Sequence, residues 1–213
     1  MNRLALTLGI VGVISSLVFA GFSETFESYN AAEGIAGKNG WQEEGRGEWF
    51  ETNATTPSDP SFLGTRYADL GNNANGTEFN AAWLTQLIGT TTAGSVTVDF
   101  DTKFNAANAG GLEACNIYLS DSSRVAGLSS DLQAAAITVG TGGLRVHDGG
   151  WRVVDNFSLL NDVWYHFWVT VNVDTKTWQL AVGTYTGETL GAPLTVSYGG
   201  DDTFAFRDSS ASM

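Results

Sequence analysis

Residues 162–185 read DVWYHFWVTVNVDTKTWQLAVGTY, and this stretch decides the fold. Apolar side chains recur at every second position in its first half, and a period of two is typical of a β-strand. The tripeptide Asp-Thr-Lys at 174–176 then supplies turn residues, and the alternation resumes after it. The pattern predicts a β-hairpin with a loop of about three to four residues. The apolar face, which a second layer must cover, consists of Val163, Tyr165, Phe167, Val169, Val171, Val173, Trp178, Leu180 and Val182.

The remainder of the chain also favours short strands separated by turns. It contains 26 glycines but only three prolines, and no stretch has the apolar stripe of an amphipathic helix. Residues 95–104 form the clearest additional strand, because Val96, Val98 and Phe100 alternate with polar side chains. This pattern predicts an all-β fold, an antiparallel β-sandwich of the jelly-roll type. Other strands are expected around Phe26 and at 67–71, 77–80, 117–119, 135–139, 144–147, 151–155, 195–198 and 203–206, whereas 83–88 fits a helical turn or a strand.

The N-terminus has the pattern of a secretory signal peptide. A basic start at Arg3 precedes the apolar run LALTLGIVGVISSLVF, and small residues stand before Gly21. We therefore expect a signal peptide at 1–20, cleaved after Ala20, and a single domain at 21–213. The alternative is a retained N-terminal membrane anchor. Both place the body outside the cytoplasm, secreted or at the cell surface, and cleavage predicts no membrane insertion of the mature protein.

The charge and the cysteine count exclude several kinds of partner and site. The formal net charge of -13 predicts repulsion from nucleic acid and from anionic membranes. Cys115 is the only cysteine, so an exported chain has to depend on packing instead of disulfides. Two histidines and one cysteine also argue against a structural zinc site.

Two stretches resemble a known family. FSETFESYNAAEGIAGKNGW at 22–41 resembles the opening of secreted bacterial domains in the concanavalin A-like lectin/glucanase superfamily, and NDVWYHFWVTVNVDTKTWQLAV at 161–182 resembles the Trp-x-His strand and hairpin of LamG-like members. The resemblance implies a concanavalin A-like β-sandwich with Trp164 and His166 at the start of a central strand. It also implies one more strand after Phe206, where this sequence reads RDSSASM, so that strand is missing or the sequence is a fragment.

The resemblance does not imply one function, because the superfamily contains lectins, glycoside hydrolases, polysaccharide lyases and adhesive modules. Its glucanases place two carboxylates on one strand face, typically as Glu-x-Asp-x-Glu, for acid catalysis on a sugar. Here only Asp99 and Asp101 share a face, the glutamates are missing, and Glu113 stands apart. We therefore expect no catalysis. The simplest interpretation of the two aspartates is a solvated outer face.

Recognition of carbohydrate is the function that the aromatic residues favour. Sugars lay their C–H faces on aromatic rings, while polar side chains bind their hydroxyl groups. We predict a carbohydrate-binding or adhesive module whose partner is a polysaccharide or a cell-surface glycan. The alternatives are a jelly-roll glycoside hydrolase or polysaccharide lyase, and a purely structural surface protein in which this face is buried. The candidate binding residues, expected to line one groove, are Trp164, His166, Trp168, Asn172, Arg145, His147, Trp151, Asp99 and Asp101.

Calcium is the one cofactor that we expect as an option. It needs only carboxylate and carbonyl oxygens, and the resemblance favours it. Aspartate-rich segments at 121–131, at Asp148 and at Asp201-Asp202 supply such oxygens, although no spacing motif selects one of them.

Overall fold

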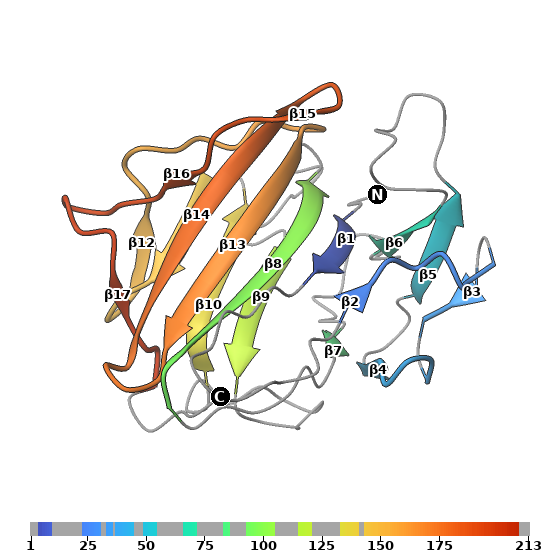
Figure 1. Cartoon of the computed structure of the whole chain (residues 1–213), viewed down its shortest axis with the longest axis horizontal. Coiled ribbons are helices and arrows are strands. Elements are labelled where there is room, and N and C mark those ends of the chain that lie inside the picture. Colours follow the sequence, from blue (N-terminus) through green and yellow to red (C-terminus); the bar gives the residue numbers. More distant parts are fainter. Residues whose placement is uncertain are drawn as a thin grey trace, which may run out of the picture.

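The structure is a computed structural model that describes residues 4–9, 23–30, 33–35, 37–44, 49–54, 66–71, 83–85, 93–104, 115–120, 133–140 and 143–208. Every regular element in these ranges is a β-strand, and all pairings between strands are antiparallel (Figure 1). The predicted all-β, antiparallel class is therefore confirmed. In the described ranges, no helix is long and apolar enough to cross a membrane.

The larger of the sheets contains eleven strands. They are β1 (Leu4–Gly9), β2 (Ser23–Glu24), β3 (Glu33–Gly34), β5 (Trp49–Ala54), β6 (Arg66–Gly71), β8 (Ser95–Phe104), β13 (Trp164–Asn172), β14 (Thr177–Thr186), β15 (Thr189–Leu190), β16 (Leu194–Thr195) and β17 (Phe204–Ala205). Their order is β15-β14-β13-β8-β1-β6-β5-β3, with β16 and β17 paired to β14 and β2 paired to β1.

Two smaller sheets complete the described structure. One has the order β12-β11-β10-β9 and the other pairs β4 with β7. The strands are β9 (Cys115–Ser120), β10 (Gln133–Gly140), β11 (Gly143–His147), β12 (Trp151–Val153), β4 (Gln42–Glu44) and β7 (Trp83–Thr85). The four-stranded sheet lies behind β8, β13 and β14 in Figure 1.

The hairpin that decides the fold forms as predicted. β13 and β14 pair from Tyr165 opposite Thr184 to Asn172 opposite Thr177, which leaves residues 173–176 as the loop. In this loop the Asn172 side chain accepts a hydrogen bond from the Thr175 amide at 3.0 Å. β8 pairs with the other edge of β13, so β13 is a central strand.

The apolar face of this hairpin is covered, as the alternation required. Phe167, Val169 and Val171 have an exposed fraction of 0%, and they belong to one buried cluster with Ile137 and Leu144 of the four-stranded sheet. Each such side chain contributes about 1.5–3 kcal/mol on burial, so this cluster is a substantial apolar source of stability. The two sheets therefore share a core.

Several predicted local elements differ in the structure. The strand expected around Phe26 is wrong, because β2 ends at Glu24 and Phe26 has a φ of 61° inside a turn. The segment 83–88, which fitted a helical turn or a strand, begins with β7. The strand predicted at 77–80 lies outside the described residues.

β1 lies within the segment for which the sequence predicts a signal peptide. It pairs with β8 from Leu4 opposite Phe104 to Gly9 opposite Asp99, and with β6 on its other edge. Signal-peptide cleavage would consequently remove a strand from the middle of the larger sheet. The position of the mature N-terminus therefore affects the stability of the larger sheet, and it can be measured by the intact mass of the protein.

Candidate functional site

The candidate site lies on the outer face of β8, β13 and β14, which we define as the face that points away from the shared core. Asp99 and Asp101 reach this face because they alternate with the buried Val98 and Phe100 along β8. His166 alternates with the buried Phe167 and stands opposite Asp101 in the register. Two segments far apart in the sequence therefore bring their predicted site residues together.

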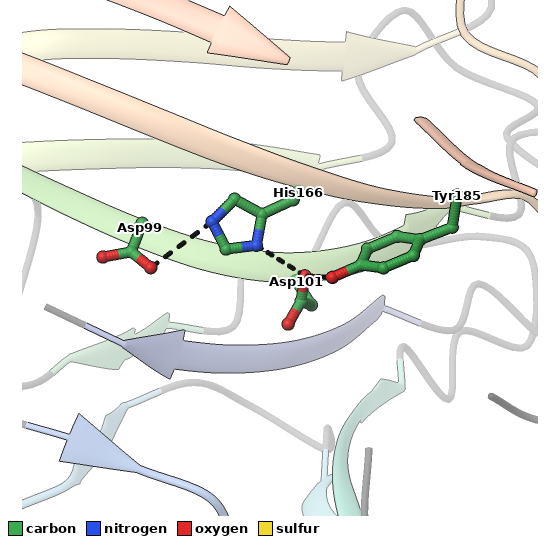
Figure 2. A network of polar contacts seen from close by, with 4 residues as sticks. All are labelled: Asp99, Asp101, His166 and Tyr185. Carbon is green, nitrogen blue, oxygen red and sulfur yellow. Dashed lines mark hydrogen bonds and ion pairs between the residues drawn. The ribbon is translucent and has the colours of Figure 1, made fainter. Parts of the chain in front are cut away.

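His166 lies between two carboxylates (Figure 2). Its Nδ1 is 2.7 Å from Asp101 Oδ1, and its Nε2 is 3.3 Å from Asp99 Oδ2. The hydroxyl of Tyr185 donates a second hydrogen bond to Asp101 Oδ1, at 2.9 Å. The side chains of His166 and both aspartates are only 13–14% exposed, so solvent screens these contacts weakly. We call these four residues the His166 network.

The charges of the network keep His166 protonated. Burial by itself lowers the pKa of His166, but hydrogen bonds to Asp101 and Asp99, together with their charges, outweigh it and raise the pKa from 6.5 to about 9. At neutral pH the imidazolium therefore donates from both nitrogens. Burial, followed by the hydrogen bond to Asp101 and its charge, raises the pKa of Tyr185, which stays a neutral donor.

One carboxylate oxygen in the network has no hydrogen-bond donor among the described residues. Asp99 Oδ1 is buried and accepts no hydrogen bond from any residue in the described ranges. A buried acceptor without a donor costs about 1–3 kcal/mol, so a hydroxyl group from water or a ligand would be stabilised at this oxygen.

The aromatic residues of the row differ in exposure. Trp168 is partly exposed, and its ring lies against the His166 imidazole with centroids 4.2 Å apart. Trp164 has an exposed fraction of only 6%, and the ammonium of Lys103 lies 5.2 Å from its ring centroid. Asn172 caps the hairpin turn instead of facing His166. Trp168 is therefore the tryptophan of this row that is placed to contact a ligand.

The other predicted site residues form a separate group. Arg145 and His147 alternate with Leu144 and Val146, which belong to the shared core, so they face away from it on the four-stranded sheet. Trp151 pairs with His147 in the register. The core thus separates this group from the His166 network, and the two groups do not line one groove.

Tyr185 and Gly183 are the members of the site that the sequence analysis missed. Leu180 and Val182 are buried on the core side of β14, so the alternate positions Gly183 and Tyr185 belong to the outer face. The alternation in the sequence therefore indicated that these two residues lie on the face of the site. A Cβ atom at Gly183 would lie 3.1 Å from the Trp168 ring and 2.7 Å from Leu190 Cδ1. Gly183 consequently leaves room for the Trp168 ring.

Two of the aspartates named for calcium accept hydrogen bonds from within the protein. Asp148 Oδ1 accepts the Ala205 amide at 3.0 Å, and Asp202 Oδ1 accepts the Thr203 hydroxyl at 3.1 Å. No group of three or more His, Cys, Asp or Glu side chains gathers around one point in the described ranges. No calcium site is therefore assigned to Asp148 or to Asp201-Asp202 within the described ranges, and the 121–131 segment lies outside them.

Comparison of the chain with models of protein families, with curated proteins and with solved structures found no match. The geometry of the site is therefore the basis of the functional argument.

Proposed function

We propose that this chain is a secreted, non-catalytic carbohydrate-binding module with the antiparallel β-sandwich of concanavalin A-like jelly rolls. The shared core between the larger and the four-stranded sheet supports that fold. Export rests on the N-terminal sequence pattern, and the partner is a polysaccharide or a cell-surface glycan at the outer face of β8, β13 and β14.

The single observation behind this function is the unmatched Asp99 Oδ1 next to the Trp168–His166 pair. A sugar hydroxyl would supply the donor that this oxygen lacks, and the Trp168 ring offers an apolar surface for the C–H face of the same sugar. His166 and Asp101 hold each other in place, so the polar side of the site is organised before a ligand arrives.

A panel of neutral glycans, titrated against the full chain, tests this proposal. Trp168→Ala and Asp99→Asn should each weaken binding of the recognised glycan about tenfold, because each removes one half of the site. Gln179→Ala is the matched control, since Gln179 lies on the same face of β14 but hydrogen-bonds Thr203. Binding that is equally strong in all three variants, each still folded by circular dichroism, would refute the site.

A hydrolase or lyase of the jelly-roll type is the second candidate, and one observation favours it. Asp99 and Asp101 share one face with a protonated donor, Tyr185, beside them. Acid catalysis, however, needs one protonated carboxyl group, and here both carboxylates face the same imidazolium. Release of reducing ends or of unsaturated products from the panel, abolished by Asp101→Asn, would favour the enzyme over the binding module.

Calcium remains a proposal for this chain, and the 121–131 segment is one of the candidates to bind it. If this segment binds the ion, millimolar calcium should raise the melting temperature of the chain relative to excess chelator, because a ligand of the folded state stabilises it. Identical melting temperatures in both solutions would contradict calcium binding by this protein.

A further inference from the structure

The outward face of the four-stranded sheet contains a second group of aromatic and basic side chains. Tyr118 on β9 lies between Ile117 and Leu119, which pack in or against the shared core, so its ring points outward. Trp151 and His147 are paired neighbours at the other end of this sheet, with their rings in edge contact at 5.4 Å between centroids.

Arg207 joins the two ends of this face. It follows β17, and its amide donates to the Ala134 carbonyl at 3.3 Å, so the chain lies along the start of β10. The guanidinium carbon lies 5.9 Å from the ring centroid of Tyr118 and 5.4 Å from that of Trp151. Two aromatic contacts of this kind restrict the guanidinium to one position.

A buried side chain also orients the guanidinium. Nη1 of Arg207 donates to Gln133 Oε1 at 2.7 Å, and Gln133 is only 1% exposed. This is the one side-chain hydrogen bond that Arg207 donates within the described ranges. A guanidinium that is held in place and has further N–H groups to donate is a preorganised binding site for a planar anion. Its N–H groups form a fork that matches two carboxylate oxygens.

Arginine side chains gather at this face although the chain as a whole is acidic. The formal net charge is -13, yet Arg145 shares the outward side of β11 with His147, and Arg207 lies nearby. Burial is the largest influence on the pKa of His147 and lowers it; the charges of Arg207 and Arg152 lower it further, against the opposing charge of Asp148. This lowered pKa disfavours the charged form of His147, so the arginines supply the positive charge of this face.

We propose that this face binds one carboxylate-bearing sugar residue, a uronate, with its carboxylate on Arg207 and its ring against Trp151. Arg145 supplies a second positive charge from the neighbouring strand. The excess of negative charge on the chain repels long polyanions, whereas a short uronate responds mainly to the nearby arginines. This site is separate from the His166 network and does not depend on it.

Titration of the full chain with a galacturonate trimer, monitored by NMR, tests the proposal. A neutral glucose trimer tests whether a sugar without charge binds, and inorganic sulfate tests whether an anion without a sugar ring binds. Arg207→Gln should weaken uronate binding at least about tenfold, the value expected for a lost hydrogen bond to a charged group. Arg207→Lys should also weaken it, because the charge remains while the planar fork is lost.

Lys38→Gln is the control variant. It removes the same charge and a similar cation–ring contact, the one between Lys38 and Tyr29 at 5.3 Å, on a different part of the chain.

If Arg207→Gln lowers the melting temperature, Arg145→Gln replaces it as the test variant, with an expected loss of uronate affinity of about threefold. Equal binding of both trimers, or equal losses in the Arg207 and Lys38 variants, would overturn the proposal. Sulfate that displaces the uronate completely would do the same. Trp168→Ala should leave uronate binding unchanged, which separates this result from a failure of the His166 site.

Discussion

Asp101 and His166 are 65 positions apart in the sequence, yet they form a side-chain hydrogen bond of 2.7 Å across the pairing of β8 with β13. The contact requires the observed register, in which the two residues stand opposite each other. A shift of one residue would move His166 to the core side of the sheet. The pair therefore links the register of the central strands to the candidate site.

The stability of the protein should fall between pH 6.5 and 9 because of His166. Its pKa is raised in the folded state from 6.5 to about 9, so its stabilising contribution is complete below 6.5 and is lost as the pH rises through 9. Urea unfolding at a series of pH values measures this loss, and His166→Gln, whose side chain does not titrate, should flatten the curve in this interval. An NMR titration of His166 with a midpoint near 6.5 would contradict the prediction.

Asp101→Asn should lower the free energy of unfolding by about 1–3 kcal/mol, because it removes the charge that the partly buried His166 and Tyr185 both contact. The pKa of His166 should fall in the same variant. Asp202→Asn is the control: Asp202 is exposed, and its substitution should change stability by less than about 0.5 kcal/mol. Similar urea midpoints for the two variants would show that the His166 network contributes little to stability.

The sequence predicts the central hairpin because strand alternation is a local property. Apolar side chains alternate from Val163 to Val173 and again from Trp178 to Val182, and the structure confirms the strands, the loop and the buried face. The same counting places Asp99, Asp101 and His166 on outer faces. It does not reveal that Asp101 stands opposite His166, since the pairing of β8 with β13 depends on tertiary packing.

Strand alternation alone also does not reveal the turn at Phe26 or the separation of the predicted single groove into two faces. Alternation around Phe26 predicts a strand, but the carboxylate of Glu24 accepts the Phe26 amide at 2.8 Å and holds a turn instead. Strand alternation puts Arg145 and His147 on an outer face, but it does not say which of two sheets their strand joins. Sheet membership is settled by the pairing of β11 with β10.

Glu24→Gln should destabilise the N-terminal segment by about 1–3 kcal/mol. Its Oε1 accepts the Phe26 amide, and its Oε2 lies 3.0 Å from Asn39 Nδ2 and 3.4 Å from Trp41 Nε1, with Glu24 only 5% exposed. An amide nitrogen in place of one oxygen would face these donors without an acceptor. Hydrogen exchange of the Phe26 amide measures the effect, and the exposed Glu27→Gln is the control. Unchanged exchange in Glu24→Gln would contradict this role.

Gly183→Ala should weaken glycan binding by displacing Trp168. The new methyl group would lie 3.1 Å from the Trp168 ring and 2.7 Å from Leu190, so at least one neighbour must move. Gly34→Ala is the control, because a Cβ there meets no atom within 4 Å. The affinity for the recognised glycan should fall several-fold in the first variant only. Unchanged affinity, together with an unchanged Trp168 fluorescence, would show that the ring position does not matter for binding.

The mature protein should begin at Gly21, and intact mass of the exported chain measures this directly. The structural consequence is specific, because cleavage removes β1 and leaves the β8 edge from Asp99 to Phe104 without its partner strand. The buried cluster that β8 shares with β13, β14 and the four-stranded sheet is built, among the described side chains, from residues 98–206, so we expect residues 21–213 still to fold. A chain that starts at Gly21 should therefore keep the pH dependence of His166. If the exported protein retains residues 4–9, or if the shorter chain does not fold, β1 is a permanent part of the sheet and the signal-peptide interpretation is wrong.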